Sequence, residues 1–321
     1  MGLLLTKERR HIKMYYNLKG FGEALKEIRH TLHLTQKDIS LKVSINLETL
    51  RKIENGLVLP KQETLDLLSS ALNMDIAELF LTYRMDHYDE LEDLKRELDF
   101  HLDSSNYALL QEDLIQFKKL ATHNMNQFFR NQVLQLIALI EGVLLGIKEK
   151  RYDLQIECYI QALSYTIENF NLEHYQTYYY NELELRLLMN IGLTKYTLED
   201  ASHCIEILLF CSNFSKENVQ IASSNLLAKL HYNLSYTFHR IDLHKKALEH
   251  ANLGIQYAVS NRSISFLAHL YFRKGIAQFH LDIPQYLETL QYAKDLFIIS
   301  NHEDLYHQML ESCKVHYGIT V

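Results

Sequence analysis

Apolar residues recur every three or four positions along most of the chain, with polar residues between them. This spacing is typical of amphipathic helices. Turn-forming residues are scarce, since 321 residues include only 2 Pro and 10 Gly. The sequence therefore predicts an all-α fold. In the N-terminal part the pattern predicts five short helices, over 21–29, 36–43, the residues after Asn46, 64–72 and 76–80.

Beyond residue 84 the predicted helices become longer. Residues 85–120 are first acidic and then amphipathic, which predicts a helical linker. The apolar run 133–147 is interrupted by Gln135 and Glu141 and is short for a bilayer, so it predicts a buried helix. An alternative for the linker is a seam that faces a partner chain, although four leucines do not establish a coiled coil. Those heptad-like leucines are Leu91, Leu94, Leu98 and Leu102.

A helix-pair pattern recurs along the chain from residue 137 onwards. Its best copy covers 230–258, and the dipeptide FH at 238–239 returns at 279–280. Looser copies lie at 186–209 and 137–163. The best copy has small and apolar residues where a tetratricopeptide repeat needs them: Leu234, Ser235, Phe238, Ala247, Ala251 and Gly254. Such pairs stack into a curved superhelix with a concave face, so residues 121–321 are predicted to form a tetratricopeptide-like (TPR-like) solenoid.

Charge is distributed unevenly along the chain. Residues 1–60 hold 11 basic and 6 acidic residues, a balance of +5, which leaves −12 for the rest of a chain whose net charge is −7. A basic N-terminal part can bind phosphates even though the whole chain is acidic. The four cysteines show no C-x-x-C spacing, which predicts reduced thiols in a cytoplasmic protein.

Residues 21–84 resemble the helix-turn-helix domain of the XRE family. The resemblance is carried by LKEIRHTLHLTQKDIS, by LRKIENG, by the small Ser40 and Ser44, and by Pro60. Thr35 and Asn46 are expected to cap the two helices of the motif. Ser44 departs from the family, which usually has glycine at that position. In such domains the second helix of the pair enters the major groove of DNA.

The resemblance also implies which side chains contact DNA. Glu48 would accept from a cytosine amino group, Lys52 would donate to guanine, and Leu47 would touch a thymine methyl group. The amide and backbone N–H groups of Gln36 would point at a phosphate. The competing interpretation is that these are only solvated polar residues. The positions carried over are Gln36, Asn46, Leu47, Glu48, Thr49, Arg51, Lys52, Asn55 and Lys61.

Cations and asparagines recur on the predicted concave face of the solenoid. Three repeats carry an i, i+4 pair just before the small crossing residue: Arg186 with Asn190, Lys229 with Asn233, and His269 with Arg273. Peptide-binding tetratricopeptide domains use Lys, Arg and Asn at such places, because asparagine bonds a peptide backbone and cations hold a carboxylate. Tyr232, Tyr236 and His231 would form walls. The alternative is an ordinary solvated helix surface.

Motifs for nucleotide or metal binding are absent from the sequence. It has no G-x-x-x-x-G-K-[ST] or G-x-G-x-x-G run and no Cys/His pair with ligand spacing, so we expect neither a cofactor nor an enzyme. The predicted domains are an N-terminal extension (1–20), a helix-turn-helix head (21–84), a helical linker (85–120) and a TPR-like body (121–321).

Together these parts resemble the RRNPP (Rgg/PlcR/PrgX) group of peptide-responsive transcriptional regulators in Gram-positive bacteria. The resemblance implies a cytoplasmic homodimer without a membrane segment. Its partners would be a double-stranded DNA operator and a short signalling peptide bound by the body. Two alternatives remain open: a repressor whose body only dimerises, and a body that binds a protein partner.

Overall fold

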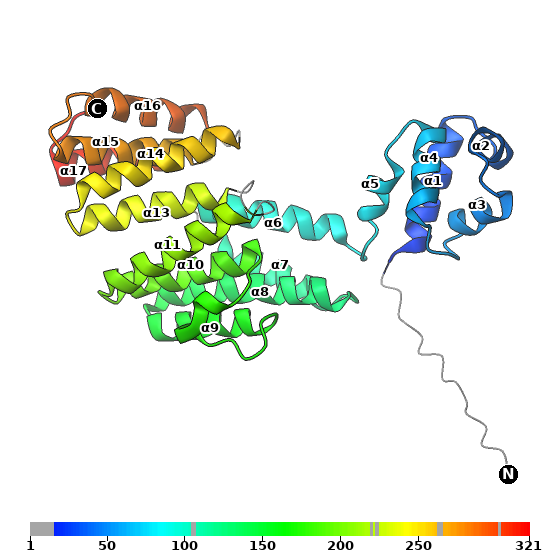
Figure 1. The fold of residues 1–321 in the computed structure, drawn as a ribbon, viewed down its shortest axis with the longest axis horizontal. Coiled ribbons are helices and arrows are strands. Elements are labelled where there is room, and N and C mark those ends of the chain that lie inside the picture. The colour runs from blue at the N-terminus through cyan, green and yellow to red at the C-terminus, as the bar shows by residue number, and fades with distance from the viewer. Residues whose placement is uncertain (1–15, 104–106, 219–220, 222–224, 262–265, 301–302) are drawn as a thin grey trace, which may run out of the picture. The chain divides into compact units, whose positions relative to one another are not determined.

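The computed structural model describes residues 16–103, 107–218, 221, 225–261, 266–300 and 303–321. Every regular element in these ranges is helical, which confirms the predicted all-α fold (Figure 1). The basic start of the chain, within residues 1–15, lies outside the described residues. The chain divides into two compact units, one of residues 1–96 with 116–130 and the other of residues 97–115 with 131–321.

The predicted helices of the head are all present. Thr35 caps α2 in a capping box with Asp38, and the Asn46 side chain caps α3 by accepting from the N–H groups of Glu48 and Thr49. Ser44, between these helices, has a φ of 55°, the left-handed conformation that glycine adopts most easily. The head helices are α1 (Leu18–Thr31), α2 (Gln36–Val43), α3 (Leu47–Glu54), α4 (Gln62–Leu72) and α5 (Ile76–Leu81).

The leucines of the predicted linker pack within the chain itself. Leu91, Leu94 and Leu98 are buried, and Leu102 is partly buried. The alternative that these leucines form a seam facing a partner chain is therefore wrong, because their side chains are already covered within the protein. The segment contains α6 (Tyr88–Asp103) and α7 (Leu110–Leu120), which are followed by α8 (Gln127–Leu144) and one π-helical turn, η1 (Leu145–Glu149).

One helical stretch among the described residues, Gln127–Glu149, is long and apolar enough to cross a membrane by length and composition alone. In the structure 61% of its most apolar window is buried inside the protein. Gly142 on α8 faces the ring of Tyr159, where an added Cβ would lie 2.3 Å from a ring carbon. The stretch thus packs as a core helix, in agreement with the prediction for 133–147.

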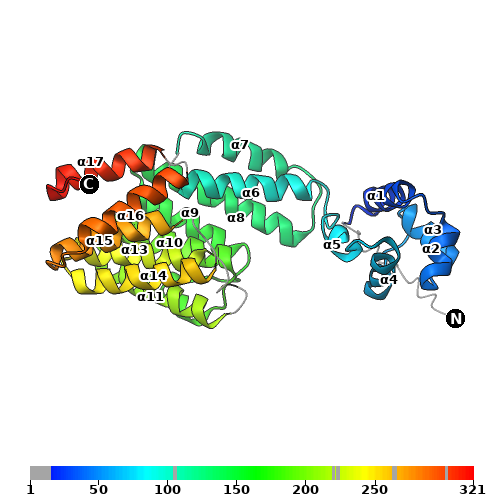
Figure 2. The same ribbon diagram turned by 90° about the horizontal axis from the view of Figure 1, so that it is seen from above.

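The body consists of successive helix pairs at the positions of the predicted repeats. The pairs α10/α11, α13/α14 and α15/α16 follow one another along the stack, and Figure 2 shows the same helices from above. A short 3-10 segment, η2 (Leu172–Thr177), precedes α10. The remaining helices are α9 (Tyr152–Ser164), α10 (Glu182–Thr197), α11 (Ala201–Glu217), α13 (Leu226–Arg240), α14 (His244–Ser260), α15 (Leu267–His280), α16 (Tyr286–Ile299) and α17 (Glu303–Tyr317).

Small residues allow the helices of the body to approach closely. Ala247 and Ala251 on α14 are fully buried, and the Ser235 hydroxyl donates to the Ala247 carbonyl at 2.8 Å. A Cβ on Gly254 would lie 2.4 Å from a methyl carbon of Leu270 on the next pair. The residues that identify the repeat in the sequence are therefore those that set the distance between its helices.

His231 on α13 is buried against α14. His231 is 4% exposed, and its ring stacks on the rings of His250 and Tyr257, at interplanar angles of 26° and 4°. One ring nitrogen lies 3.0 Å from Nδ1 of His250 and the other 3.3 Å from the Ser212 hydroxyl. The prediction that His231 forms a wall of the concave face is therefore wrong. Burial lowers the pKa of His231 to about 3 and also lowers the pKa of His250.

Acidification should destabilise the body through His231. An unfolded histidine has a pKa of about 6.5. Below that pH His231 is protonated in the unfolded chain but stays neutral in the folded protein. The contribution of neutral His231 to the free energy of unfolding is complete above pH 6.5. It is lost as the pH falls towards about 3, the pKa of His231 in the folded protein. At pH 5 the loss from this group is about 2 kcal/mol.

Thermal unfolding measured at pH 7.5 and at pH 5 checks this prediction. His231→Phe keeps the aromatic stack and should show a smaller change in melting temperature between the two values than the wild type. His307→Gln, which alters an exposed histidine, should behave as the wild type. An identical pH dependence in His231→Phe and in the wild type would show that His231 is not responsible.

Candidate functional site

A buried ion pair fixes the geometry of the helix-turn-helix head. The Arg29 guanidinium donates to both carboxylate oxygens of Glu54, at 2.7 and 2.8 Å, and both side chains are almost fully buried. Arg29 also donates to the Leu34 carbonyl at 3.0 Å. The hydrogen bond to Glu54 raises the pKa of Arg29. This pair ties the end of α1 to the end of α3 and to the loop before α2, and we did not predict it from the sequence.

Gln36 belongs to the same network. Its side-chain amide donates to Oε2 of Glu54 at 2.7 Å, and the residue is half-buried. We expected this amide to point at a phosphate, and in the structure it points into the head instead. The physical reason is that the Glu54 carboxylate is buried and gains a third hydrogen bond from the nearest amide. The backbone N–H groups at the start of α2 remain the expected phosphate contact of this region.

The exposed face of α3 carries the side chains that we expected to reach the bases. Leu50 and Ile53 are buried in the head core, while the other face presents Leu47, Glu48, Thr49, Arg51 and Lys52 to solvent. Asn46, Asn55 and Lys61 are exposed as well. The structure thus places these predicted residues on the surface of the head.

Charges on this face neutralise one another in part. The Glu48 carboxylate accepts from Nε and Nη2 of Arg51 at 2.9 and 2.8 Å, and Nζ of Lys52 lies 3.7 Å away. The hydrogen bond from Arg51 lowers the pKa of Glu48, so this carboxylate is ionised near neutral pH. Glu48 therefore has an intramolecular partner on the very surface where we expected it to contact a cytosine.

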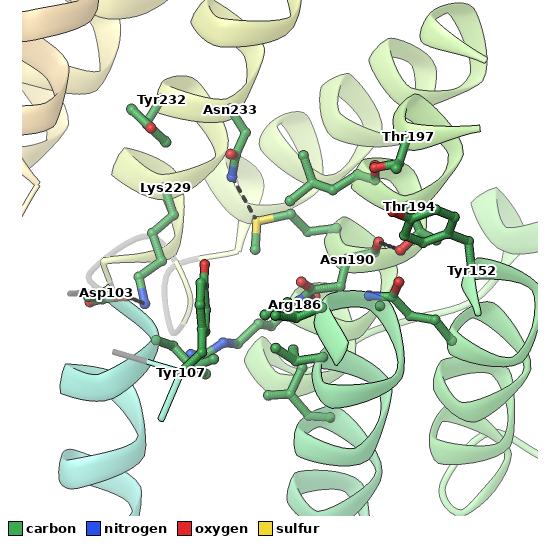
Figure 3. A pocket seen from close by; sticks show the side chains of 18 of the residues that line it. Asp103, Tyr107, Tyr152, Arg186, Asn190, Thr194, Thr197, Lys229, Tyr232 and Asn233 are labelled. Carbon is green, nitrogen blue, oxygen red and sulfur yellow. Dashed lines mark hydrogen bonds and ion pairs between the residues drawn. The ribbon is translucent and has the colours of Figure 1, made fainter. Parts of the chain in front are cut away.

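A cavity in the body has a volume of about 580 Å³ and brings together six of the eight predicted peptide-binding residues. Its walls come from α6, α8, α9, α10, α13 and the start of α15 (Figure 3). We call it the first cavity. The six residues are Arg186, Asn190, Lys229, Tyr232, Asn233 and His269. Tyr236 and Arg273 do not line it.

Two acidic residues of α6 neutralise two buried cations of the first cavity. Nζ of Lys229 lies 2.8 Å from the Asp103 carboxylate, and the Arg186 guanidinium forms an ion pair with Asp99 (Figure 3). The side chains of Lys229 and Arg186 are only 11% and 14% exposed. Burial lowers the pKa of Lys229 and raises that of Asp103, the directions that desolvation gives a buried pair. Lys150, a third cation lining the cavity, is exposed to solvent.

The asparagines of the first cavity hydrogen-bond to neighbouring protein groups. The Asn190 amide donates to the Arg186 carbonyl one turn earlier at 2.7 Å, and the Asn233 amide lies 3.7 Å from the Met189 sulfur (Figure 3). A contact to sulfur is a weak hydrogen bond, so Asn233 can exchange it for a better acceptor. The lining combines apolar side chains with several hydroxyl groups: Leu102, Leu139, Val143, Leu193, Phe266, Tyr107, Tyr152, Thr194 and Thr197.

A second cavity, of about 410 Å³, contains the other two predicted residues, Tyr236 and Arg273. The Arg273 guanidinium lies 4.8 Å from the Tyr236 ring centre and 5.5 Å from the ring centre of Tyr232, which belongs to the first cavity. Two residues that we did not predict, Arg240 and Tyr317, also line the second cavity. Tyr317 lies on α17, beyond the repeats, and nothing in its local sequence indicates this position.

The acidic residues of α6 were likewise not predicted to belong to the site. Asp99 and Asp103 are four positions apart, as are the members of each predicted cation and asparagine pair. This spacing places both carboxylates on one side of a helix. From this spacing the sequence could have predicted that the acidic linker supplies carboxylates to pair with cations of the body.

Comparisons with known proteins agree with this architecture. Residues 25–79 match the helix-turn-helix family. Among curated proteins no relative matches the chain. Two solved structures of PlcR from Bacillus thuringiensis are similar over nearly the whole chain. The complex with the peptide PapR7 and DNA has a TM-score of 0.73 at 16% identity, with 91% of this chain and 99% of that chain covered.

The apo form of PlcR has a TM-score of 0.58 at 14% identity and covers 91% of this chain and 98% of that chain. A variant of the SHP pheromone receptor Rgg2 from Streptococcus dysgalactiae has a TM-score of 0.52 at 13% identity, with 94% and 99% covered. Residues 25–79 are thus a helix-turn-helix domain by sequence, and the chain as a whole shares its fold with PlcR and Rgg2.

Proposed function

We propose that this protein is a sequence-specific DNA-binding transcriptional regulator whose TPR-like body binds a short signalling peptide and thereby controls DNA binding. The observation that carries the proposal is the shared fold with PlcR in complex with a peptide and DNA, over 91% of this chain. The fold is accompanied by a matching helix-turn-helix domain at one end and a lined cavity in the body. We place the protein in the cytoplasm, where DNA is accessible.

The DNA-binding half of the proposal rests on α3 and on the start of α2. The exposed residues of α3 form a surface that a major groove accommodates, with Arg51 and Lys52 as donors. A recess beside this helix, lined among others by His33, Gln36 and Lys37, surrounds the first turn of α2. Backbone N–H groups at a helix start favour a phosphate, and Lys37 adds a positive charge there.

The peptide-binding half rests on the first cavity. It has an apolar lining with a few polar groups from several helices, which is the usual composition of a ligand site. Asn190 and Asn233 lie on the first helices of two successive repeats, where side-chain amides can bond the backbone of an extended peptide. A peptide backbone exposes one donor and one acceptor per residue, so repeated amides suit it well.

We propose that the protein acts as a homodimer, because one helix-turn-helix head contacts only one half-site. Exposed apolar residues on α16 and α17 support a dimer contact there, since Ile298, Ile299 and Val315 are more than half exposed. These exposed residues are equally compatible with the two alternatives, a body that only dimerises and a body that binds a protein partner. These alternatives do not require the first cavity to bind anything.

Lys52→Ala should weaken binding to the operator by about 1–3 kcal/mol and relax the preference at one base pair, because a donor to a base edge is lost. The operator is obtained by selection from random DNA with the full chain. Lys19→Ala, an exposed lysine on α1, serves as the matched control and should bind as the wild type. Unchanged affinity and selectivity in Lys52→Ala would show that α3 is not the recognition helix.

Glu48→Gln should have the opposite effect on non-specific DNA. The carboxylate neutralises part of the charge of Arg51 and Lys52 and repels phosphates, so its removal frees two cations for DNA. Affinity for random DNA should increase, and its dependence on salt should become steeper. Titrations at several salt concentrations measure both quantities. Weaker non-specific binding by Glu48→Gln would contradict the assigned orientation of α3.

Asn190→Ala and Asn233→Ala should each weaken peptide binding by about 1–3 kcal/mol, because a buried peptide group loses its hydrogen-bond partner. The peptide is selected from a random heptapeptide library with the full chain, and calorimetry gives its affinity. Asn213→Ala, an exposed asparagine on α11, is the matched control. Normal binding by both cavity variants, with unchanged melting temperatures, would show that these two asparagines of the first cavity do not hold the peptide.

A further inference from the structure

Arg84 lies where the helix-turn-helix head ends and the helical linker begins. It belongs to the loop between α5 and α6 and is half-buried. The compact unit that contains the head continues past this loop to Arg96 and also includes residues 116–130. That unit therefore contains the first turns of both α6 and α8. The loop after α5 is a single covalent connection, so other contacts must keep the start of α8 in the unit.

The Arg84 guanidinium connects three helices at this place. Its Nε donates to the Leu81 carbonyl at the end of α5 at 2.9 Å, and its Nη2 donates to the Tyr88 hydroxyl on the first turn of α6. The guanidinium carbon lies 4.7 Å from the centre of the Tyr88 ring and 5.5 Å from that of Phe129, on the first turn of α8. A cation is attracted to aromatic faces, so one side chain holds the ends of three helices together.

The groups around this guanidinium are fixed by contacts of their own. Phe129 is only 4% exposed and meets Tyr88 edge to face, with ring centres 5.8 Å apart. The Asn126 side chain caps α8 by accepting from the Phe129 N–H at 3.0 Å. On the side of the head, the Tyr83 carbonyl accepts from the Asn17 N–H at 2.9 Å. The guanidinium thus bridges two sets of groups that are each anchored without it.

The two helices that Arg84 joins to α5 also contribute to the first cavity. Each is continuous from its first turn, beside the guanidinium, to the residues that line the cavity. The lining residues of α6 and α8 are Leu102, Asp103, Leu139 and Val143. A continuous helix transmits a displacement along its axis, because its backbone hydrogen bonds keep its length.

Removal of the guanidinium should loosen this joint without unfolding the protein. The rings of His87 and His123 form a second contact between the same two loops, with ring centres 4.0 Å apart. The head also has a core of its own, built from residues between Leu18 and Phe80. The fold and DNA binding by the head should therefore survive the loss of Arg84.

We propose that Arg84 is a positioning residue for regulation: it fixes the head to the starts of α6 and α8, so that a change at the first cavity reaches the DNA-binding surface. The proposal rests on the proposed function, in which peptide binding controls DNA binding. It adds the joint through which the two sites influence each other. Without the guanidinium the helices would move at the cavity while the head stayed unaffected.

Hydrogen exchange of the full chain, without any ligand, tests the joint. Arg84→Met keeps the length of the side chain and removes its charge and its N–H donors. Backbone N–H groups of residues 85–94 and 127–133 should exchange about tenfold faster in this variant, because a cation–aromatic contact and two hydrogen bonds are lost. Arg96→Met removes an exposed arginine of α6 and is the matched control, which should exchange as the wild type.

Hydrogen exchange with bound operator tests transmission through the joint. Coupling is reciprocal, so DNA at the head should also act on the cavity. The operator should slow exchange of residues 97–103 and 137–144, the cavity ends of α6 and α8, in the wild type and in Arg96→Met. Arg84→Met should bind the same operator with an affinity within about twofold of the wild type, but without this slowing. An arginine that only stabilised the fold would leave the slowing intact.

Three results would overturn the proposal. The first is unchanged exchange at the helix starts in Arg84→Met. The second is an operator that slows exchange at the cavity ends equally in Arg84→Met and in the wild type. The third is an operator that leaves exchange at the cavity ends of the wild type unchanged. Melting curves of each variant show that the fold is retained.

These experiments separate the joint from the proposed function. If the operator slows exchange through Arg84 and no heptapeptide binds the body, the joint stands and the proposed peptide-sensing function fails. If a selected heptapeptide changes operator affinity by the same factor in Arg84→Met and in the wild type, the peptide-sensing function stands and the role of Arg84 fails.

Discussion

Two cations of the first cavity can be buried only because carboxylates accompany them, and this requirement determines how the body is organised. Lys229 and Arg186 are largely removed from water, and an unpaired buried charge would destabilise a fold by several kcal/mol. Asp99 and Asp103 supply the opposite charges from one side of α6. The acidic linker is therefore a structural part of the cavity and more than a spacer between domains.

The same pairing separates the basic residues of the body into two groups. Cations paired with α6 stabilise the position of a helix, while Arg240 and Arg273 lack such acidic partners within the described residues. The pattern of cations in the sequence cannot distinguish these groups, because the same spacing argument places Arg186, Lys229 and Arg273 on one concave face. Only the position of the carboxylates makes the distinction. In the proposed function, a peptide that displaced Asp99 or Asp103 would act on α6, which follows the head in the chain.

Local interactions were predictable from the sequence. The caps at Thr35 and Asn46 bond residues two or three positions away, and the repeat pattern depends on small residues where neighbouring helices cross. For this reason the five head helices and the repeated helix pairs lie where the sequence predicts them. Six of the eight predicted residues of the concave face also line one cavity, because a shared helical face follows from spacing.

Long-range pairings could not be predicted in the same way. Arg29 and Glu54 are 25 residues apart, and Asp99 and Arg186 are 87 apart. Nothing in either local sequence selects its partner. The inward direction of the Gln36 amide was not predicted for the same reason, since its acceptor is the Glu54 carboxylate, 18 residues away. The prediction for His231 was wrong because this residue lies on another side of α13 than Tyr232 and Asn233. Those two line the first cavity, whereas the His231 ring packs against α14.

The proposed function requires that peptide and DNA bind to one molecule and influence each other. The most direct test measures operator affinity with and without saturating heptapeptide, and peptide affinity with and without operator, for the full chain at one salt concentration. Because linkage is reciprocal, both affinities should change by the same factor, of about 5- to 150-fold. An operator affinity that is identical with and without bound peptide would contradict the proposed function.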